Sequence, residues 1–293
     1  MMSAGLRDIK LRSRRTELLL VATVLVFSIP LILGYGLLIL SSFSKEMVTN
    51  LNPHDFIPTL RNWILFFEGR TAVFGGIRVN IWNIVLNTLI VALGVSFLVT
   101  LVGSMTGYAV SRLKFSGRKR FMALLMLLHA FPGSVMVVGI YFLYLMFLPS
   151  YQLVRFYSFF FVIVARASLE IPMATWLMKG FFDMIPWEVE WAALVDGASR
   201  LKVWRKVILP MVKPGVAAVM LFGFLAGWMD IIYVRTFLVD QTLATWIEAN
   251  INAEYSYLPL VAAAGTFYLL PTIIFFLLAQ RLIFTISATG VKG

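Results

Sequence analysis

Long apolar runs constrain this chain more than any other feature of its sequence. Stretches of about 20 or more predominantly apolar residues lie at about 18–41, 83–107, 121–147, 156–180, 207–232 and 257–284. Each is long enough to cross the roughly 30 Å hydrocarbon core of a bilayer as an α-helix. Lipid satisfies no backbone polar group, and the runs are too uniformly apolar for the alternating strands of a barrel. The predicted fold is therefore an all-α integral membrane protein with six transmembrane helices.

Composition and charge narrow the class of protein further. Hydrophobic residues make up 60% of the chain and charged residues 13%, whereas soluble proteins have roughly 25% charged residues. The absence of cysteine and the presence of only two histidines exclude a disulfide framework and a thiolate or histidine-cluster metal site. The net charge of +11 comes from basic residues that flank the apolar runs. We therefore predict contact with membrane lipid and none with nucleic acid.

The distribution of lysine and arginine predicts the orientation in the membrane. The two termini, the loop after the second run and the segment between the fourth and fifth runs together hold 18 of the 25 basic residues, and the opposite side holds 6. Basic residues are enriched in cytoplasmic loops. Both termini are thus expected in the cytoplasm, with residues 1–17 as a tail and 18–293 as a single transmembrane domain. The run of about 23 apolar residues from Leu18 to Leu40 is too long for a cleaved signal peptide.

A charged segment at 181–206, between the fourth and fifth runs, is too short and too polar to span. Pro186 suits a first helical turn, and Glu188 and Glu190 complement the dipole near the helix start. Gly197 can end this helix in a left-handed conformation, and Ser199 can cap a second short helix. The sequence predicts helix, glycine turn, helix. Periodicity alone leaves two readings open, an element seated in a partner's groove or an amphipathic pair on lipid headgroups.

The same segment resembles the cytoplasmic EAA loop of binding-protein-dependent ATP-binding-cassette (ABC) permeases. The loop pattern is Glu-Ala-Ala, three residues, Gly, about nine residues, Ile, one residue, Leu-Pro. With Gly197 as anchor, the matching residues are Ala192, Ala193, Asp196, Gly197, Ala198, Ile208, Leu209 and Pro210. Trp191 holds the position of the motif's Glu, and Glu190 lies one residue earlier.

The resemblance covers nearly the whole chain and is closest to carbohydrate importers of the maltose type, in particular to the smaller permease of the pair. It rests on the runs 87–92, 107–119, 131–133 and 176–185 and on the C-terminal residues 280–282 and 289–293. The chain departs from the family at Trp228, Met229 and Asp230, where Trp-Asn-Glu is usual.

The resemblance implies a set of partners and a mechanism. The partners are a second, larger permease in a heterodimer, two ABC ATPase subunits and an extracytoplasmic solute-binding protein, in the plasma (inner) membrane of a prokaryote. ATP and Mg would be bound by the ATPase subunits, with no cofactor in this chain. The loop would then transmit ATPase closure to the spans as a rigid-body motion. The residues expected to couple to the ATPase are Glu190, Trp191, Ala192, Ala193, Asp196, Gly197, Ala198, Leu209 and Pro210.

Polar residues within the apolar runs are candidates for the solute path. A sugar path needs hydrogen-bonding groups and aromatic faces, and the candidates are Asn83, Asn87, Ser134, Tyr141 and Trp228. Arg166 and Glu170, four residues apart, are expected to neutralise each other inside the bundle rather than to form an ion path. His129 is expected to bond a neighbouring helix.

Two other function classes remain to be weighed. The sequence has no G-x-x-x-x-G-K-[ST] phosphate loop, so this chain is not expected to hydrolyse ATP itself. A self-contained secondary carrier or channel would require an ion path or repeat symmetry, and neither is evident. A membrane enzyme would require a nucleophile with a base, or a set of metal ligands, which two distant histidines and no cysteine do not supply. An importer permease for a sugar or sugar-like solute is the leading prediction.

Overall fold

The computed structural model describes residues 2–49, 52, 55–69, 80–251 and 257–289, without the side chains of 2–16 and 278–289. The described residues are helical apart from loops and one isolated bridge between Ser44 and Pro58. They fall into two compact units, residues 1–72 with 255–267, and residues 73–254 with 268–293. The two C-terminal motifs of the resemblance, at 280–282 and 289–293, lie outside the residues whose side chains are described.

The first unit contains α1 (Met2–Ser42) and α2 (Arg61–Phe67), together with the first residues of α13 (Leu258–Thr289). A buried asparagine joins α2 to the chain that follows α1. The Asn62 side-chain amide donates to the carbonyl oxygens of Ser42 at 3.0 Å and Ser44 at 2.8 Å. These two hydrogen bonds fix the start of α2 against the residues that follow α1.

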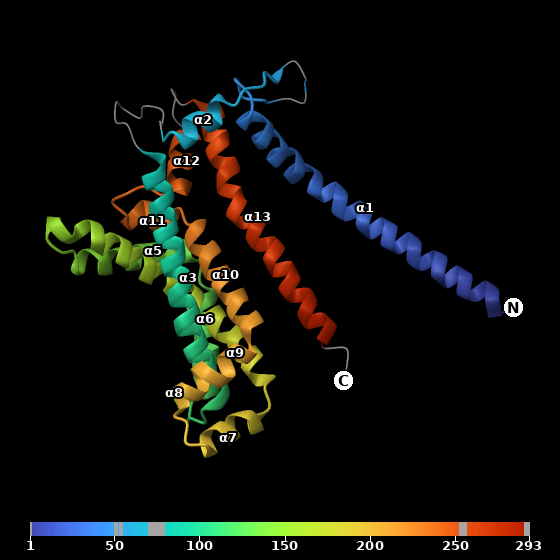
Figure 1. Ribbon diagram of the computed structural model, residues 1–293, viewed down its shortest axis with the longest axis vertical. Helices are drawn as coiled ribbons and strands as arrows, with labels where there is room; N and C mark the ends of the chain where they lie inside the picture. The colour runs from blue at the N-terminus through green and yellow to red at the C-terminus, as the bar shows by residue number, and fades with distance from the viewer. Residues whose placement is uncertain (1, 50–51, 53–54, 70–79, 252–256, 290–293) are drawn as a thin grey trace. The chain divides into compact units, whose positions relative to one another are not determined.

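The second unit holds the remaining elements. These are α3 (Ile81–Arg112), α4 (Arg118–Ala130), α5 (Gly133–Met146), η2 (Tyr151–Leu153), α6 (Val154–Asp183), α7 (Trp187–Val195), α8 (Arg200–Val203), η3 (Trp204–Ile208), α9 (Leu209–Met211), α10 (Lys213–Trp228), α11 (Ile232–Phe237), α12 (Leu243–Ile251) and the rest of α13. Helices α3, α6 and α10 pack together at its centre, with α7 to α9 at one end (Figure 1).

Glycines allow these three helices to approach closely. A Cβ added at Gly107 of α3 would lie 2.8 Å from the Met178 Cβ of α6, and one added at Gly227 of α10 would lie 2.8 Å from the Ala92 Cα of α3. Each glycine has a glycine partner four residues earlier, Gly103 and Gly223, in equally tight contact. Such Gly-x-x-x-Gly spacing lets membrane helices pack backbone to backbone. Both α6 and α10 therefore pack closely against α3.

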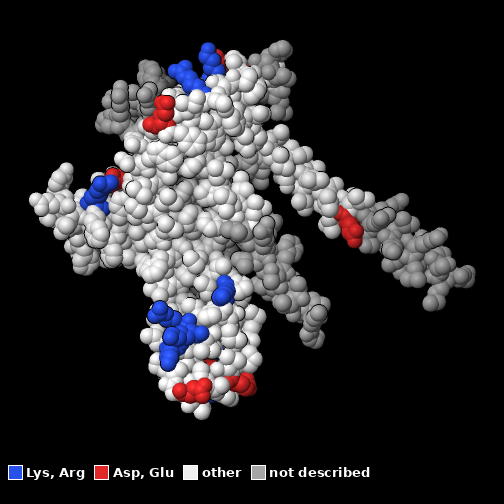
Figure 2. Space-filling view, in the orientation of Figure 1, with Lys and Arg blue, Asp and Glu red and all other residues white. Residues whose placement is uncertain are grey.

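Four single helices are long and apolar enough to span a membrane, in Glu17–Ser42, Ile81–Arg112, Tyr151–Asp183 and Leu258–Leu277. Two further spans are bent pairs, and counting each pair once gives six, as predicted. On the visible face of the second unit, charged side chains gather near α7 to α9, and the helices above them are mostly white, with a further blue and red patch at the left edge (Figure 2). These features confirm the predicted all-α membrane fold.

The predicted continuous third span, 121–147, is broken. Helices α4 and α5 meet at 98°, with Phe131 extended at φ −75° and ψ 133°. Proline disfavours the helical region for the residue before it, so Pro132 ends α4 at this point. The run is apolar throughout, which is why its composition alone predicted one helix.

The predicted fifth span, 207–232, is also bent, and its last residues lie beyond α10, which ends at Trp228. Residues 207–211 belong to η3 and α9, which are bent by 90° from α10 at Val212. Pro214 lies in the first turn of α10. Because proline has no backbone N–H and its ring clashes with the carbonyl group four residues earlier, the α-helix cannot continue unbroken from α9 through this position. The loop predicted at 181–206 is correspondingly shifted, because α6 continues to Asp183 and the short helices continue to Met211.

Candidate functional site: a helical loop and a charged cavity

The loop folds locally as its sequence predicts. Helix α7 ends at Val195, and Gly197, two residues later, takes a left-handed conformation with a φ of +80°. The Ala198 amide donates to the Ala193 carbonyl at 3.1 Å and the Gly197 amide to the Leu194 carbonyl at 3.0 Å, the pair of bonds of a Schellman cap. Ser199 then caps α8, accepting from the Lys202 amide at 3.4 Å. The predicted helix, glycine turn and helix are confirmed.

Glu190 is buried beneath the loop, with 1% of its surface exposed. The Tyr108 hydroxyl of α3 donates to its Oε1 at 2.7 Å. Arg112 Nε lies 3.5 Å from Oε2, and Arg200 Nη1 lies 3.5 Å from Oε1. A buried carboxylate requires such partners, since an unpaired one would ionise only at great cost. We call Tyr108, Arg112 and Glu190 the loop clamp.

Arg112 extends the loop clamp to α6. Its Nη2 donates to the carbonyl oxygens of Phe182 and Ile185, each at 2.6 Å. Its guanidinium carbon lies 4.6 Å from the ring centre of Trp187, the first residue of α7, in the geometry of a cation–π contact. One side chain of α3 therefore contacts the end of α6, the connecting turn and the start of α7.

The outer face of the loop carries exposed apolar side chains. Val195 is 87% exposed and Trp191 is 56% exposed. The prediction groups Glu190 with the ATPase-coupling residues, but its carboxylate points inward and is not part of this face. Of the other predicted coupling residues, five are exposed and three are half-buried: exposed are Trp191, Ala192, Asp196, Gly197 and Pro210, and half-buried are Ala193, Ala198 and Leu209.

The predicted solute-path residues do not lie together. Asn87 donates to the Gln241 carbonyl at 3.0 Å, ahead of α12. Trp228 is buried and stacks on Tyr268 with ring centres 5.5 Å apart. Tyr141 stacks on Phe237, and Asn83 is exposed on α3. Of the five, Ser134 alone lines a described cavity that also holds charged groups.

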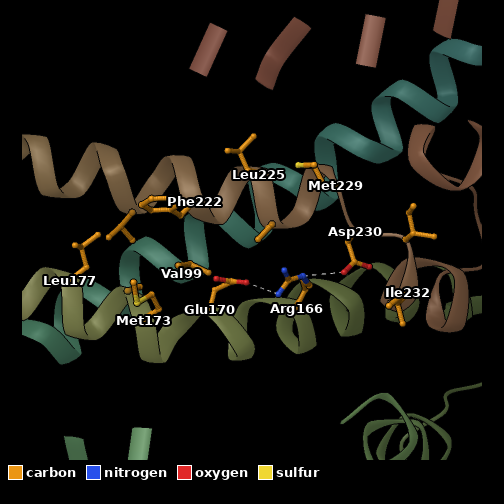
Figure 3. Close-up of a pocket in the computed structure, with 14 residues that line it drawn as sticks. Val99, Arg166, Glu170, Met173, Leu177, Phe222, Leu225, Met229, Asp230 and Ile232 are labelled. Atoms are coloured by element: carbon orange, nitrogen blue, oxygen red, sulfur yellow. Dashed lines mark ion pairs between the residues drawn. The ribbon is translucent and has the colours of Figure 1, made fainter. Parts of the chain in front are cut away.

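That cavity shares three ionisable residues, Arg166, Glu170 and Asp230, with a larger cavity beside it. Arg166 Nη1 lies 2.8 Å from Glu170 Oε1, as the spacing predicts, and Arg166 Nε lies 3.1 Å from Asp230 Oδ2. Figure 3 shows the guanidinium between the two carboxylates. The larger cavity has a volume of about 580 Å³ and the smaller about 270 Å³. His129 lines the smaller one, and its Nδ1 lies 3.0 Å from the Leu169 carbonyl oxygen of α6, which confirms the predicted helix-to-helix bond.

Two features of these sites were not predicted. Asp230 joins Arg166 from the α10–α11 connection, where its Oδ1 accepts from the Tyr233 and Val234 amides at 2.9 and 3.0 Å. Its departure from the family pattern was visible in sequence, but its ion partner was not. The close packing at the glycine pairs was also not predicted, although their four-residue spacing is a recognisable signal for it. The pairs are Gly103 with Gly107 and Gly223 with Gly227.

Comparison with known proteins agrees with this architecture. Residues 99–285 match the family described as binding-protein-dependent transport system inner membrane component. The chain is 31% identical over 212 residues to the maltodextrin transport system permease protein MdxG of Bacillus subtilis, covering 71% of this chain and 74% of that one. It is 28% identical to MalD, a maltodextrin permease protein of Streptococcus pneumoniae, over 98% of this chain and 99% of that one.

Solved structures share the fold at lower identity. A chain of a bacterial ABC transporter that imports the acidic polysaccharide alginate superposes with a TM-score of 0.66 at 18% identity. The match covers 92% of this chain and 97% of that one.

Proposed function

The chain belongs to the family of inner membrane components of binding-protein-dependent transport systems, and from this premise we propose that it forms half of a carbohydrate path and is driven through its α7–α8 loop. Family membership makes the chain a membrane permease subunit of an ATP-driven importer and not an enzyme. ATP hydrolysis takes place in partner ATPase subunits, and a solute-binding protein delivers the solute.

One observation carries the driving role of the loop. An exposed apolar face that includes Trp191 and Val195 lies on a helix whose other face is tied to α3 and α6 through the loop clamp. An exposed apolar face favours a partner's groove. The hydrogen bonds of Tyr108 and Arg112 link α7 and the turn before it to α3 and α6. A displaced α7 would therefore move the two central helices with it.

The carbohydrate is proposed from the relatives. Two of the relatives are named as maltodextrin permease proteins, and one of them aligns over almost its full length. We further propose that the second half of the path is a larger permease, that both termini lie in the cytoplasm and that residues 1–17 form a cytoplasmic tail. The basic residues near α7 to α9 support this orientation.

Co-purification from native membrane in mild detergent tests the proposal. The wild-type chain is expected to retain an ABC ATPase and a second permease, both identified by mass spectrometry. Val195→Glu would place a charge on the exposed face and is expected to lose the ATPase and keep the permease. Val195→Ile, which keeps an apolar side chain there, serves as the matched control. A chain that purifies as a homo-oligomer, or a Val195→Glu variant that keeps its ATPase, would contradict the assignment.

A further inference from the structure

The charged cavity beside Arg166 has no role in the function proposed above. The larger of the two cavities that share Arg166 lies among α3, α6 and α10 and is lined mainly by apolar side chains, among them Met173 and Phe222. Arg166, Glu170 and Asp230 supply its charge (Figure 3). An inference about its contents rests on the proposed transport function, because it concerns the solute that this path admits.

The charges of the cavity do not cancel. One guanidinium faces two carboxylates, so the formal charge of the three side chains is one negative unit. Asp230 also caps α11, which accounts for its presence structurally. Glu170 has only the Arg166 pair among the described contacts, and its second oxygen is free to accept. Ionisable groups within the bilayer are costly, and where they persist they mark solute or ion pathways.

The chemistry of the lining suits a particular kind of solute. Carboxylate oxygens accept hydrogen bonds from hydroxyl groups, guanidinium nitrogens donate to them, and apolar side chains such as Met173 and Phe222 can cover the C–H face of a sugar ring. The volume of about 580 Å³ lies within the range of small-molecule sites. A net negative charge repels anions, most strongly where little water screens it.

We infer that the cavity lined by Arg166, Glu170 and Asp230 is a solute subsite that admits neutral polyhydroxyl molecules and disfavours anionic ones such as sugar phosphates. Glu170 is the acceptor for solute hydroxyl groups. Arg166 holds both carboxylates in place and donates with its remaining N–H groups.

The absence of cysteine from the sequence allows a direct test. Met173→Cys on α6 places one thiol in the cavity, and Phe222→Cys on α10 repeats the measurement from the facing helix. Each variant is assembled with its partner subunits and treated with a cationic or an anionic water-soluble methanethiosulfonate. Rates are divided by those of the same reagents with free cysteine. Leu93→Cys, exposed on α3 and outside both cavities, reports background labelling.

The cationic reagent is expected to react with Met173→Cys at least about fivefold faster than the anionic one. That is the ratio that one unit of charge gives at about 8 Å even with the dielectric constant of water. Adding Glu170→Gln, which removes one carboxylate without changing shape, should bring the normalised ratio close to one. Equal rates in the parent, an unchanged ratio in the Glu170→Gln variant, or no labelling at both cavity positions would overturn the inference.

Protection by solute separates this inference from the proposed function. Maltose is expected to slow labelling of Met173→Cys more than glucose 6-phosphate does, and stronger protection by glucose 6-phosphate would refute the charge selection. Uptake of maltodextrin by the wild-type complex in proteoliposomes is measured separately. If labelling shows the charge preference but no sugar is taken up, the carbohydrate proposal fails and the subsite stands. If sugar is taken up without the charge preference, the subsite fails alone.

Discussion

Removing one hydroxyl group from the loop clamp should loosen the whole of α7. Tyr108 is 6% exposed, and its hydroxyl donates to the buried Glu190 carboxylate at 2.7 Å. Tyr108→Phe keeps the ring, including its edge-to-face contact with Phe182 at 5.9 Å, and deletes only this bond. The perturbation therefore isolates one contact between α3 and the loop.

The magnitude follows from the kind of bond that is lost. A hydrogen bond to a charged group contributes about 1.5–3 kcal/mol. Glu190 keeps Arg112 and Arg200, both at 3.5 Å, so the carboxylate does not become unpaired. If α7 opens as a unit, its amide hydrogens should exchange roughly 10 to 150 times faster, because about 1.4 kcal/mol corresponds to a factor of ten.

Hydrogen–deuterium exchange measured by mass spectrometry on the complex in nanodiscs provides the assay. Peptides that cover α7 are compared between wild type and Tyr108→Phe. Tyr141→Phe is the control, since no hydrogen bond of the Tyr141 hydroxyl is found among the described residues and the ring lies on α5. Exchange in α7 that stays within about twofold of wild type would refute the idea that the loop clamp holds the helix.

Two further predictions concern glycines. Gly197→Asp should leave the chain inserted and paired with its permease partner but weaken ATPase attachment, because the φ of +80° costs an L-residue roughly 1–2 kcal/mol and the carboxylate adds charge to the exposed turn. Gly197→Asn is the control that keeps the backbone strain without the charge. Unchanged transport by Gly197→Asp would exclude a coupling role for the turn. Gly107→Ala should destabilise the detergent-solubilised protein by about 1–3 kcal/mol in a thermal shift assay, since the new Cβ meets Met178 Cβ at 2.8 Å and the backbone nitrogen of Lys179 at 3.0 Å. Gly139→Ala, with no atom within 4 Å of its new Cβ, gains the same helix propensity and is expected to be neutral or stabilising; equal melting temperatures for the two variants would contradict close packing at Gly107.

Local chemistry explains what was predictable. The ends of α7 and α8 depend on Gly197 and Ser199 and on backbone groups within a few residues of them, so the sequence pattern was sufficient there. The apolar runs likewise predicted the spans, because bilayer thickness sets their length. The break before Pro132 was signalled by the proline, but apolarity outweighed it in the prediction.

Long-range contacts explain what was not predictable. Glu190 is buried because Tyr108 and Arg112, far earlier in the chain, reach it. Asn87 and Trp228 looked suited to a solute path, yet their side chains are used to bond Gln241 and Tyr268. Polar and aromatic groups in membrane helices serve packing as readily as solute binding, and sequence alone does not separate the two uses.

The wide π-helical turn η3 has a consequence for chain length. In a π-helix each hydrogen bond spans one residue more than in an α-helix, so a π-turn is equivalent to an inserted residue. Removing one residue from Trp204–Ile208 would let α8 and α9 join as a regular α-helix, with Leu209 and Pro210 facing nearly the same side as before. The same deletion within a regular α-helix would rotate every following residue by about 100°. The extra residue of η3 thus lets this segment lose one residue without redirecting α10 beyond the bend at Val212.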